Sequence, residues 1–278
     1  MRGRLADLPP ALVLALAALF GLAVGSFLNV CIYRVPRDLS VVRPRSFCPG
    51  CDVPVGWYDN IPVLSFLLLR GRCRHCRQPI GWSYLLVEAI TAITFVAVIR
   101  TYGLSLPAAK WIVYECLLII LFWTDWHDRI LPDEFTLGGG VLGLLFAFLV
   151  FVPGILGEVL LGNRAGWRSE SIVNAAVGGL FASLPIWLLG FLYEKLRGRE
   201  GLGFGDVKLL FLLGAYLGPE NALSALTLGA TAGAIFGIVQ LLLKRQEAWS
   251  YALPFGSFLC AAGYLIPLLT RAALVPIR

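Results

Sequence analysis

Charged residues are scarce in this chain. They make up 14% of its 278 residues, whereas hydrophobic residues make up 58%. A soluble domain carries about a quarter charged residues, so the composition excludes an ordinary soluble domain and predicts a polytopic membrane protein that contacts a lipid bilayer. A concentrated basic tract is also absent. The net charge of +6 is spread over several loops, so it indicates membrane topology and no nucleic-acid partner.

The first apolar run lacks the small-residue cleavage site that would follow a signal peptide. Arg2 and Arg4 precede the run as they would in a signal peptide, but Arg34 and Arg37 follow it. The run is long enough to cross a bilayer, for which about 20 residues are needed. We therefore expect a retained first transmembrane span.

Long apolar runs dominate the rest of the chain. They predict an all-α polytopic membrane protein with about eight transmembrane helices, to which the cysteines described below add a small zinc-stapled cytoplasmic loop domain. The third and sixth runs are short, and short runs interrupted by glycine are a pointer to a functional site in membrane proteins. The eight runs are Ala11–Ile32, Trp82–Ile99, Lys110–Thr124, Phe135–Leu156, Ile172–Leu192, Val207–Leu217, Asn221–Leu243 and Tyr251–Leu269.

The distribution of Lys and Arg predicts the orientation. Most of the 23 basic residues fall in the alternate loops 33–81, 125–134, 193–208 and 244–250, so these loops are expected to be cytoplasmic. Arg43 and Lys195 should then face the cytoplasm, and Arg164 should lie outside.

Two aspartates lie at predicted membrane-edge helix ends, both on the cytoplasmic side. Asp206 follows alternating glycines and opens an apolar run, whereas Asp125 closes another. Either acid alone is explained by helix capping, but two acids in comparable places suggest carboxylates that share one proton. Lys208 is either a counter-ion for Asp206 or a side chain that extends to the lipid headgroups.

Other polar residues near these acids have simpler explanations. Asp128 and Asp133 are expected to cap or solvate a turn, and His127 is expected to be a surface residue. Within the apolar runs, Glu88 and Glu115 are acids without an obvious partner, and Glu88 is the better candidate for a polar ligand site.

Four cysteines form two C-x-x-C pairs in the first loop, which is too small to build a strong core alone. Two such pairs, 21 residues apart, are typical of a structural zinc site with four thiolate ligands. Disulfides or a redox pair are the alternatives, and a reducing cytoplasm disfavours disulfides. His75 then lies beside the site and does not bind the metal. The predicted ligands are Cys48, Cys51, Cys73 and Cys76.

Several motifs together resemble the bacterial type IV prepilin peptidases, which are bifunctional leader peptidases and N-methyltransferases of the membrane aspartic protease class. They occur in family order and cover residues 20 to 215. The matching segments are Gly25–Pro36, the two C-x-x-C pairs, Asn60–Ser65, Leu69–Cys73, Leu86–Glu88, Asp125 through Pro132-Asp133, and Gly203–Lys208.

The resemblance implies the catalytic residues. They are the first acid of the D-x6-P-D segment and the acid of Gly-x-Gly-Asp, which are Asp125 and Asp206 here. Relatives often carry another Asp two positions after the first acid, where this chain has His127 and moves the extra acid to Asp128. The spacing to Pro132 favours Asp125.

The resemblance also implies the substrates. They are type IV prepilins and pseudopilins, cut after a glycine and then N-methylated from S-adenosylmethionine in the bacterial inner membrane, with the active site facing the cytoplasm. No Gly-x-Gly-x-x-Gly motif of the Rossmann type marks the methyl-donor site. By resemblance that site involves the zinc loop, with Gly71 and Glu88 as candidates.

Two other functions fit the paired aspartates. A presenilin-type intramembrane aspartic protease shares Gly-x-Gly-Asp, but the large cysteine loop disfavours it. A proton-coupled transporter would predict internal repeats, which are absent. The expected organisation is a first span at 1–32, a zinc loop domain at 33–81, and a seven-span domain at 82–278 that carries the protease site.

Overall fold

The computed structural model describes residues 9–162, 166–198, 203–244 and 253–269. Within these ranges every regular element is a helix, and the β-structure is confined to two isolated bridges. The chain forms two compact units, residues 1–120 and 121–278, which are described separately. The all-helical prediction is confirmed. Gly201 of the glycine-rich approach and Arg164 lie outside the described residues.

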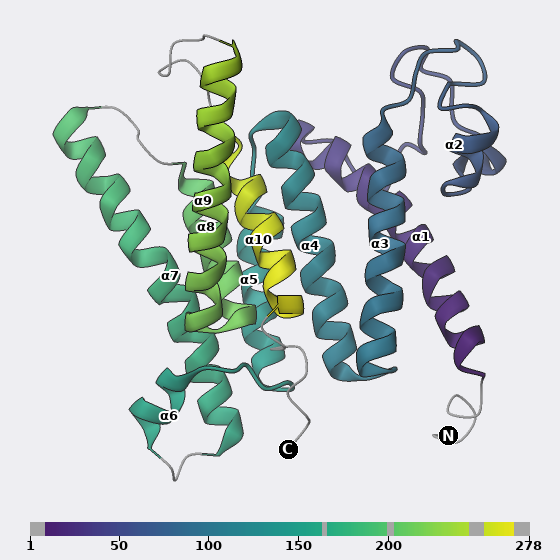
Figure 1. Cartoon of the computed structure of the whole chain (residues 1–278). Coiled ribbons are helices and arrows are strands. Elements are labelled where there is room, and N and C mark those ends of the chain that lie inside the picture. The colour runs from purple at the N-terminus through teal and green to yellow at the C-terminus, as the bar shows by residue number, and fades with distance from the viewer. Residues whose placement is uncertain (1–8, 163–165, 199–202, 245–252, 270–278) are drawn as a thin grey trace. The chain divides into compact units, whose positions relative to one another are not determined.

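The first unit is built on a pair of long helices, α1 (Pro10–Arg34) and α3 (Trp82–Tyr102), which lie side by side (Figure 1). Glycines on α1 permit the close contact. A Cβ at Gly21 would lie 2.7 Å from the Cα of Ala92, and one at Gly25 would lie 2.7 Å from the Cα of Glu88. Small residues at a helix contact are typical of membrane proteins, in which packing drives association.

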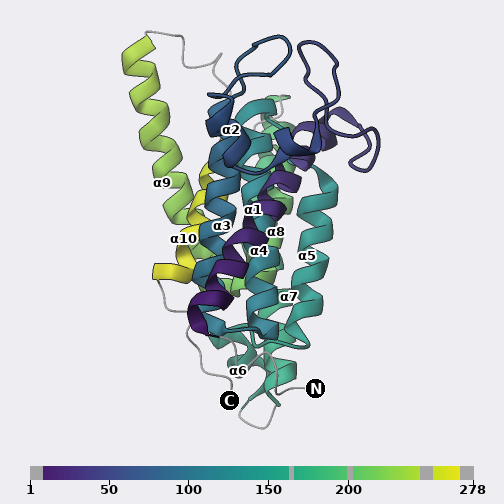
Figure 2. The same cartoon turned by 90° about the vertical axis from the view of Figure 1, so that its right-hand side faces the viewer.

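The cysteine-rich loop connects these two helices. It contains the short helices η1 (Val35–Arg37), η2 (Trp57–Asn60) and α2 (Leu64–Leu68) and lies at the C-terminal end of α1 (Figure 2). The buried guanidinium of Arg34 organises its first part, because it donates to the carbonyl oxygens of Ser40 at 2.8 Å and Arg45 at 3.2 Å. Helix α4 (Leu106–Asp128) follows α3, and its last turns belong to the second unit.

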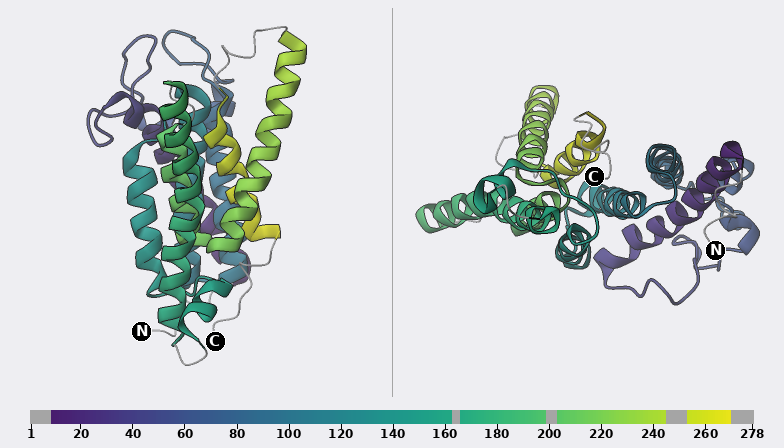
Figure 3. Two further views of the ribbon diagram at one scale, coloured as in Figure 1. Left: turned by 90° about the vertical axis from the view of Figure 1, so that its left-hand side faces the viewer. Right: turned by 90° about the horizontal axis from the view of Figure 1, so that it is seen from below.

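Helix α8 (Phe204–Leu217) is the core of the second unit. It contacts α5 (Asp133–Ala147), α7 (Trp167–Arg197), α9 (Pro219–Lys244) and α10 (Phe255–Leu269). Its residues from Leu212 to Leu217 are all buried. Helix α9 packs along α10. The C-terminal end of α9 inclines away from α7 (Figure 3).

Among the described residues, five helices are long and apolar enough to cross a membrane: residues Pro10–Arg37, α3, α4, α7 and α9. The third apolar run, Lys110–Thr124, lies within a longer helix, because helical structure begins at Leu106 and continues to Asp128, which gives α4 23 residues. Helices α5, α8 and α10 have 14 or 15 residues each. The count of eight spans therefore stays a prediction.

The fourth apolar run is not one helix, so the predicted span Phe135–Leu156 is wrong in its extent. Helix α5 ends at Ala147, and α6 (Ile155–Leu161) begins after an irregular segment. The buried side chain of Asn174 supports this break, since it donates to the carbonyl oxygens of Val152 and Gly154 and accepts from the N–H of Gly157. A single amide thus satisfies backbone groups that a continuous helix would satisfy internally.

Candidate functional site

Asp125 lies in the last turn of α4, and its side chain is buried with 6% exposure. Its carboxyl oxygen Oδ2 accepts hydrogen bonds from the backbone N–H of Ser257 at 2.6 Å and from the Ser257 hydroxyl at 2.8 Å. Ser257 is the third residue of α10. Amide groups in the first turn of a helix have no intrahelical partner, so this one is available to Asp125.

Asp206 lies in the first turn of α8 and is half-buried. The N-cap of this helix is Gly203, whose carbonyl oxygen accepts from the N–H of Asp206 at 3.1 Å. Asp206 is therefore not the N-cap residue of this helix. A Cβ at Gly203 would lie 3.5 Å from Oδ2 of Asp206, so the carboxyl group of Asp206 folds back toward the N-cap residue.

The two acids come together around Leu131. A Cβ at Gly205 would lie 3.1 Å from the Cβ of Leu131, and a Cβ at Gly256 would lie 2.9 Å from its Cδ1 and 3.1 Å from the carboxyl carbon of Asp125. A side chain at either glycine would press on Leu131, so glycine at these two positions favours the close approach. Their carboxyl groups are near enough for their charges to interact. The structure thus joins the end of α4 and the starts of α8 and α10 at one place.

The neighbouring polar residues have other roles. The ammonium of Lys208 lies 2.6 Å from the carboxylate of Asp133 and 4.7 Å from the ring centroid of Phe204. Lys208 therefore pairs with Asp133, and the alternative that it is the counter-ion of Asp206 is not supported. His127 is exposed and stacks on Trp123, whereas Asp128 is half-buried.

Ser257 is the residue that the sequence did not reveal. It falls in the last apolar run, which resembles the family only in hydropathy. A signal was present: Pro254 and Gly256 beside a serine at the start of an apolar run are typical of a helix N-terminus. Nothing in the sequence indicates that this N-terminus meets Asp125, which is 132 positions away.

The four predicted zinc ligands form one cluster. The sulfur atoms of Cys48, Cys51, Cys73 and Cys76 all lie within 4.8 Å of one another, and those of Cys48 and Cys76 are 3.7 Å apart. Four thiolates around a zinc ion at about 2.3 Å each are about 3.8 Å from one another. The cluster therefore fits a tetrahedral zinc ion.

The two C-x-x-C segments repeat the same local structure. The N–H of Cys48 donates to the carbonyl of Val53, and the N–H of Cys73 donates to the carbonyl of Gln78. Asp52 and Arg77, each four residues after the first cysteine, have φ values of 54° and 61°. Each segment is thus a tight turn that directs two sulfur atoms to one point.

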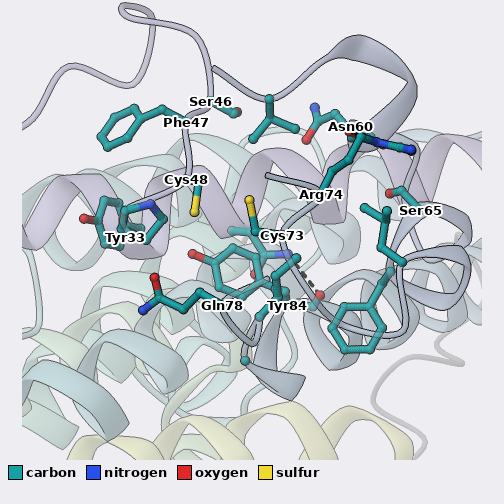
Figure 4. Close-up of a pocket in the computed structure, with 18 of the residues that line it drawn as sticks. Tyr33, Ser46, Phe47, Cys48, Asn60, Ser65, Cys73, Arg74, Gln78 and Tyr84 are labelled. Atoms are coloured by element: carbon teal, nitrogen blue, oxygen red, sulfur yellow. Dashed lines mark hydrogen bonds and ion pairs between the residues drawn. The ribbon is translucent and has the colours of Figure 1, made fainter. Parts of the chain in front are cut away.

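A cavity of about 280 Å³ lies beside this cluster, within the first unit. Cys48 and Cys73 face each other at one side of it, near Gln78 and Tyr84 (Figure 4). Aromatic and polar side chains dominate the remaining wall. They include Tyr33, Phe47, Asp59, Asn60, Phe66, Arg74, Tyr84 and Glu88.

Asp59 and Arg74 form an ion pair in the cavity wall. The guanidinium of Arg74 lies 2.6 Å from the carboxylate of Asp59 and 5.5 Å from the ring centroid of Tyr58. Hydrogen bonds from Arg74 hold the pKa of Asp59 below its usual range. The ion pair therefore holds a carboxylate and a guanidinium group in fixed positions in the cavity wall.

The two predicted methyl-donor residues lie in different places. Glu88, on α3, lines the cavity, and its Oε2 accepts from the backbone N–H of Val63 at 2.7 Å. Gly71 does not line it. Gly71 has φ of 65°, and a Cβ there would lie 2.9 Å from the ring of Phe66, so the lack of a side chain at Gly71 lets this ring line the cavity.

The long apolar helices and the cysteine cluster define a multi-pass helical membrane protein with a cysteine-rich loop. Two protein-family models match it: the Bacterial Peptidase A24 N-terminal domain over residues 19–102 and the Type IV leader peptidase family over residues 112–238. The chain belongs to the type IV leader peptidase family, and it is therefore an enzyme. The family resemblance inferred from the motifs is confirmed.

Curated relatives agree with this assignment. A prepilin leader peptidase/N-methyltransferase of Aeromonas hydrophila is 35% identical, with 92% of this chain and 90% of the relative covered. One of Myxococcus xanthus is 40% identical over 80% of this chain and 61% of the relative. One of Neisseria gonorrhoeae is 35% identical, with 90% and 88% covered. No solved structure matches the chain.

Proposed function

We propose that this protein removes the leader from type IV prepilins and pseudopilins, cutting after a glycine with Asp125 and Asp206, and then N-methylates the new N-terminal residue. The observation that carries the cleavage proposal is the convergence of the two acids around Leu131 at three helix ends. The names of the relatives support the substrate class and the second activity. Family membership favours this function over a presenilin-type protease or a proton-coupled transporter.

The cleavage step follows from two carboxyl groups that share one proton. The ionised carboxylate accepts a proton from water as the water oxygen bonds to the scissile carbonyl carbon. The protonated carboxyl group gives its proton to the carbonyl oxygen. When the tetrahedral intermediate collapses, the C–N bond breaks and the leaving nitrogen receives a proton. The products are a leader with a C-terminal carboxylate and a mature chain with a free amine.

The proposed setting is the bacterial inner membrane, with eight spans and the dyad at the cytoplasmic face. The basic residues concentrated in the alternate loops support this orientation. The five helices of spanning length within the described part of the chain support a multi-pass protein. Helices α5, α8 and α10 would supply the other three spans, with α8 short because its N-terminus carries Asp206 at the membrane edge.

We place the methyl donor, S-adenosylmethionine, in the cavity beside the cysteine cluster. Aromatic rings such as Tyr33 and Tyr84 suit an adenine ring and a sulfonium cation, and the carboxyl groups of Glu88 and Asp59 suit its hydroxyl and ammonium groups. When bound, the donor supplies a methyl group to the N-terminal amine as the C–S bond breaks and the nitrogen loses a proton. The residues of this cavity bind and orient the two reactants.

Zinc in this proposal is structural. Four cysteines close a tetrahedral site and leave no position for a substrate. The bound ion would hold both C-x-x-C turns together and thereby fix one wall of the cavity, which includes Cys48 and Cys73.

Mass measurement of a prepilin after incubation with the purified protein tests the proposal. Wild type should remove the leader and, with S-adenosylmethionine, add the mass of one methylene group. Asp125→Asn and Asp206→Asn should each abolish cleavage, and the double variant should be little worse, because the two acids act as one unit. Asp128→Asn is the matched control.

Methylation of a pre-cleaved substrate should persist in both aspartate variants. An Asp125→Asn protein that cleaves would show that Asp125 is not part of the dyad. A wild-type protein that leaves prepilin intact under all conditions would contradict the proposed function.

A further inference from the structure

The two acids of the proposed dyad have different surroundings. Oδ2 of Asp125 receives two hydrogen bonds from Ser257, whereas the described residues show no such donor pair for Asp206. An aspartic dyad needs one ionised and one protonated member, so an asymmetry of this kind decides which acid carries the proton.

The backbone N–H of Ser257 is the decisive donor. The Ser257 hydroxyl has one proton and two acceptors within reach, Asp125 Oδ2 at 2.8 Å and the carbonyl oxygen of Phe122 at 3.0 Å. The N–H group can only donate, and its distance to Oδ2 is 2.6 Å. A proton on Oδ2 would face this donor, whereas a carboxylate oxygen accepts from it in a charge-assisted hydrogen bond.

The position of Ser257 in α10 adds to this effect. It is the third residue of the helix, so its amide belongs to the positive end of the helix dipole, which favours an anion. Gly256 allows the helix to come this close, because a Cβ there would lie 3.1 Å from the carboxyl carbon of Asp125.

We infer that Ser257 and the N-terminus of α10 keep Asp125 ionised, so that Asp125 accepts the proton from water and Asp206 is the protonated acid. This inference rests on the proposed peptidase function and assigns the two roles within it. Ser257 is a positioning residue, since it acts on Asp125 and not on the substrate.

Other charged and titratable groups surround Asp125. Among the described residues they are Asp206 from α8, Arg129 just beyond α4, and Cys260 from α10. The carboxylate of Asp206 would oppose a second negative charge at Asp125, so proton sharing still applies. Arg129 favours an ionised Asp125, and its Nη1 also donates to the main-chain oxygen of Asp125 at 3.3 Å.

The test is the pH dependence of prepilin cleavage in a series of Ser257 variants. Ser257→Pro removes both donors, and proline is tolerated in the first turn of a helix. Loss of a hydrogen bond to a charged group should move the acid limb of the rate profile upward by about one pH unit or more. Ser257→Ala, which keeps the N–H, should move it less, and Ser257→Thr should resemble wild type.

Controls separate this inference from folding and from the proposed function. Ser224→Ala on α9, an exposed serine, should leave the profile unchanged. Recovery of the wild-type maximal rate at higher pH would show that the variants are folded. If Ser257→Pro does not fold, Ser257→Ala and Ser257→Thr test the hydroxyl donor: Ser257→Ala should still move the acid limb upward, and Ser257→Thr should not.

Profiles of folded Ser257 variants that coincide with an active wild type would overturn the inference. A shift confined to the alkaline limb would also overturn it, because Asp125 would then be the protonated acid. Absence of cleavage by wild type at every pH would instead contradict the proposed peptidase function.

Discussion

The backbone at Val63 is strained, and one side chain from α3 holds it in place. Val63 has φ of 61° and ψ of −50°, and the N–H of Leu64 donates to the carbonyl of Pro62 at 2.6 Å. This is a γ-turn with positive φ, which is strained for any residue and especially for a β-branched one. The N–H of Val63 donates to the carboxyl group of Glu88 at 2.7 Å. We predict that Glu88→Ala releases this turn.

The magnitudes of the two effects are comparable. Residues in such sparsely populated conformations cost about 1–3 kcal/mol. Leaving the partly buried N–H of Val63 without its acceptor costs about 1 kcal/mol, the lower end of the range for buried groups, which lowers the population of the strained loop by a factor of about 5. The loop should therefore relax locally while the helices α1 and α3 remain paired.

Hydrogen exchange and limited proteolysis of residues 61–69 would measure this change. Glu88→Gln is the matched control, since its amide oxygen still accepts the hydrogen bond. Adding Val63→Gly to Glu88→Ala should restore part of the protection, because glycine adopts positive φ without strain.

Function gives a second measurement of the same variant. Because Glu88 and Phe66 both line the cavity, Glu88→Ala should reduce methylation and leave prepilin cleavage largely intact. A Glu88→Ala protein with wild-type protection of the loop would refute the reasoning. Loss of methylation in Glu88→Gln with a protected loop would show that the charge of Glu88 acts on the donor directly.

Three further predictions concern other parts of the chain. Elemental analysis should find about one zinc ion per chain, and Cys48→Ser should lose it, because three thiolates bind the ion less tightly; a metal-free protein with a protected loop would contradict this. Lys208→Met should change the free energy of unfolding by no more than about 1 kcal/mol, because it removes a partly exposed ion pair; a shifted pH profile of cleavage would instead tie Lys208 to Asp206. Cysteines introduced at Arg43 and Lys195 should react with a membrane-impermeant reagent only from the cytoplasmic side; labelling from the opposite side would reverse the orientation.

Sequence alone determined the features that depend on local composition and short spacing. Apolar runs identify membrane helices because a helix satisfies its own backbone hydrogen bonds. The spacing within each C-x-x-C pair brings its two sulfur atoms together through a tight turn, so spacing alone was enough to group Cys48, Cys51, Cys73 and Cys76. The spacing from Asp125 to Pro132-Asp133 carried the family assignment in the same way.

Only the tertiary structure decided which distant groups meet. Ser257 reaches Asp125 across 132 positions, and Lys208 reaches Asp133 across 75. Sequence spacing leaves such partners undetermined, because they depend on how the helices pack. The break between α5 and α6 has the same origin, since Asn174 from α7 satisfies its backbone groups. Hydrophobicity predicts that a segment is apolar, but a hydrogen bond from another helix determines where that segment bends.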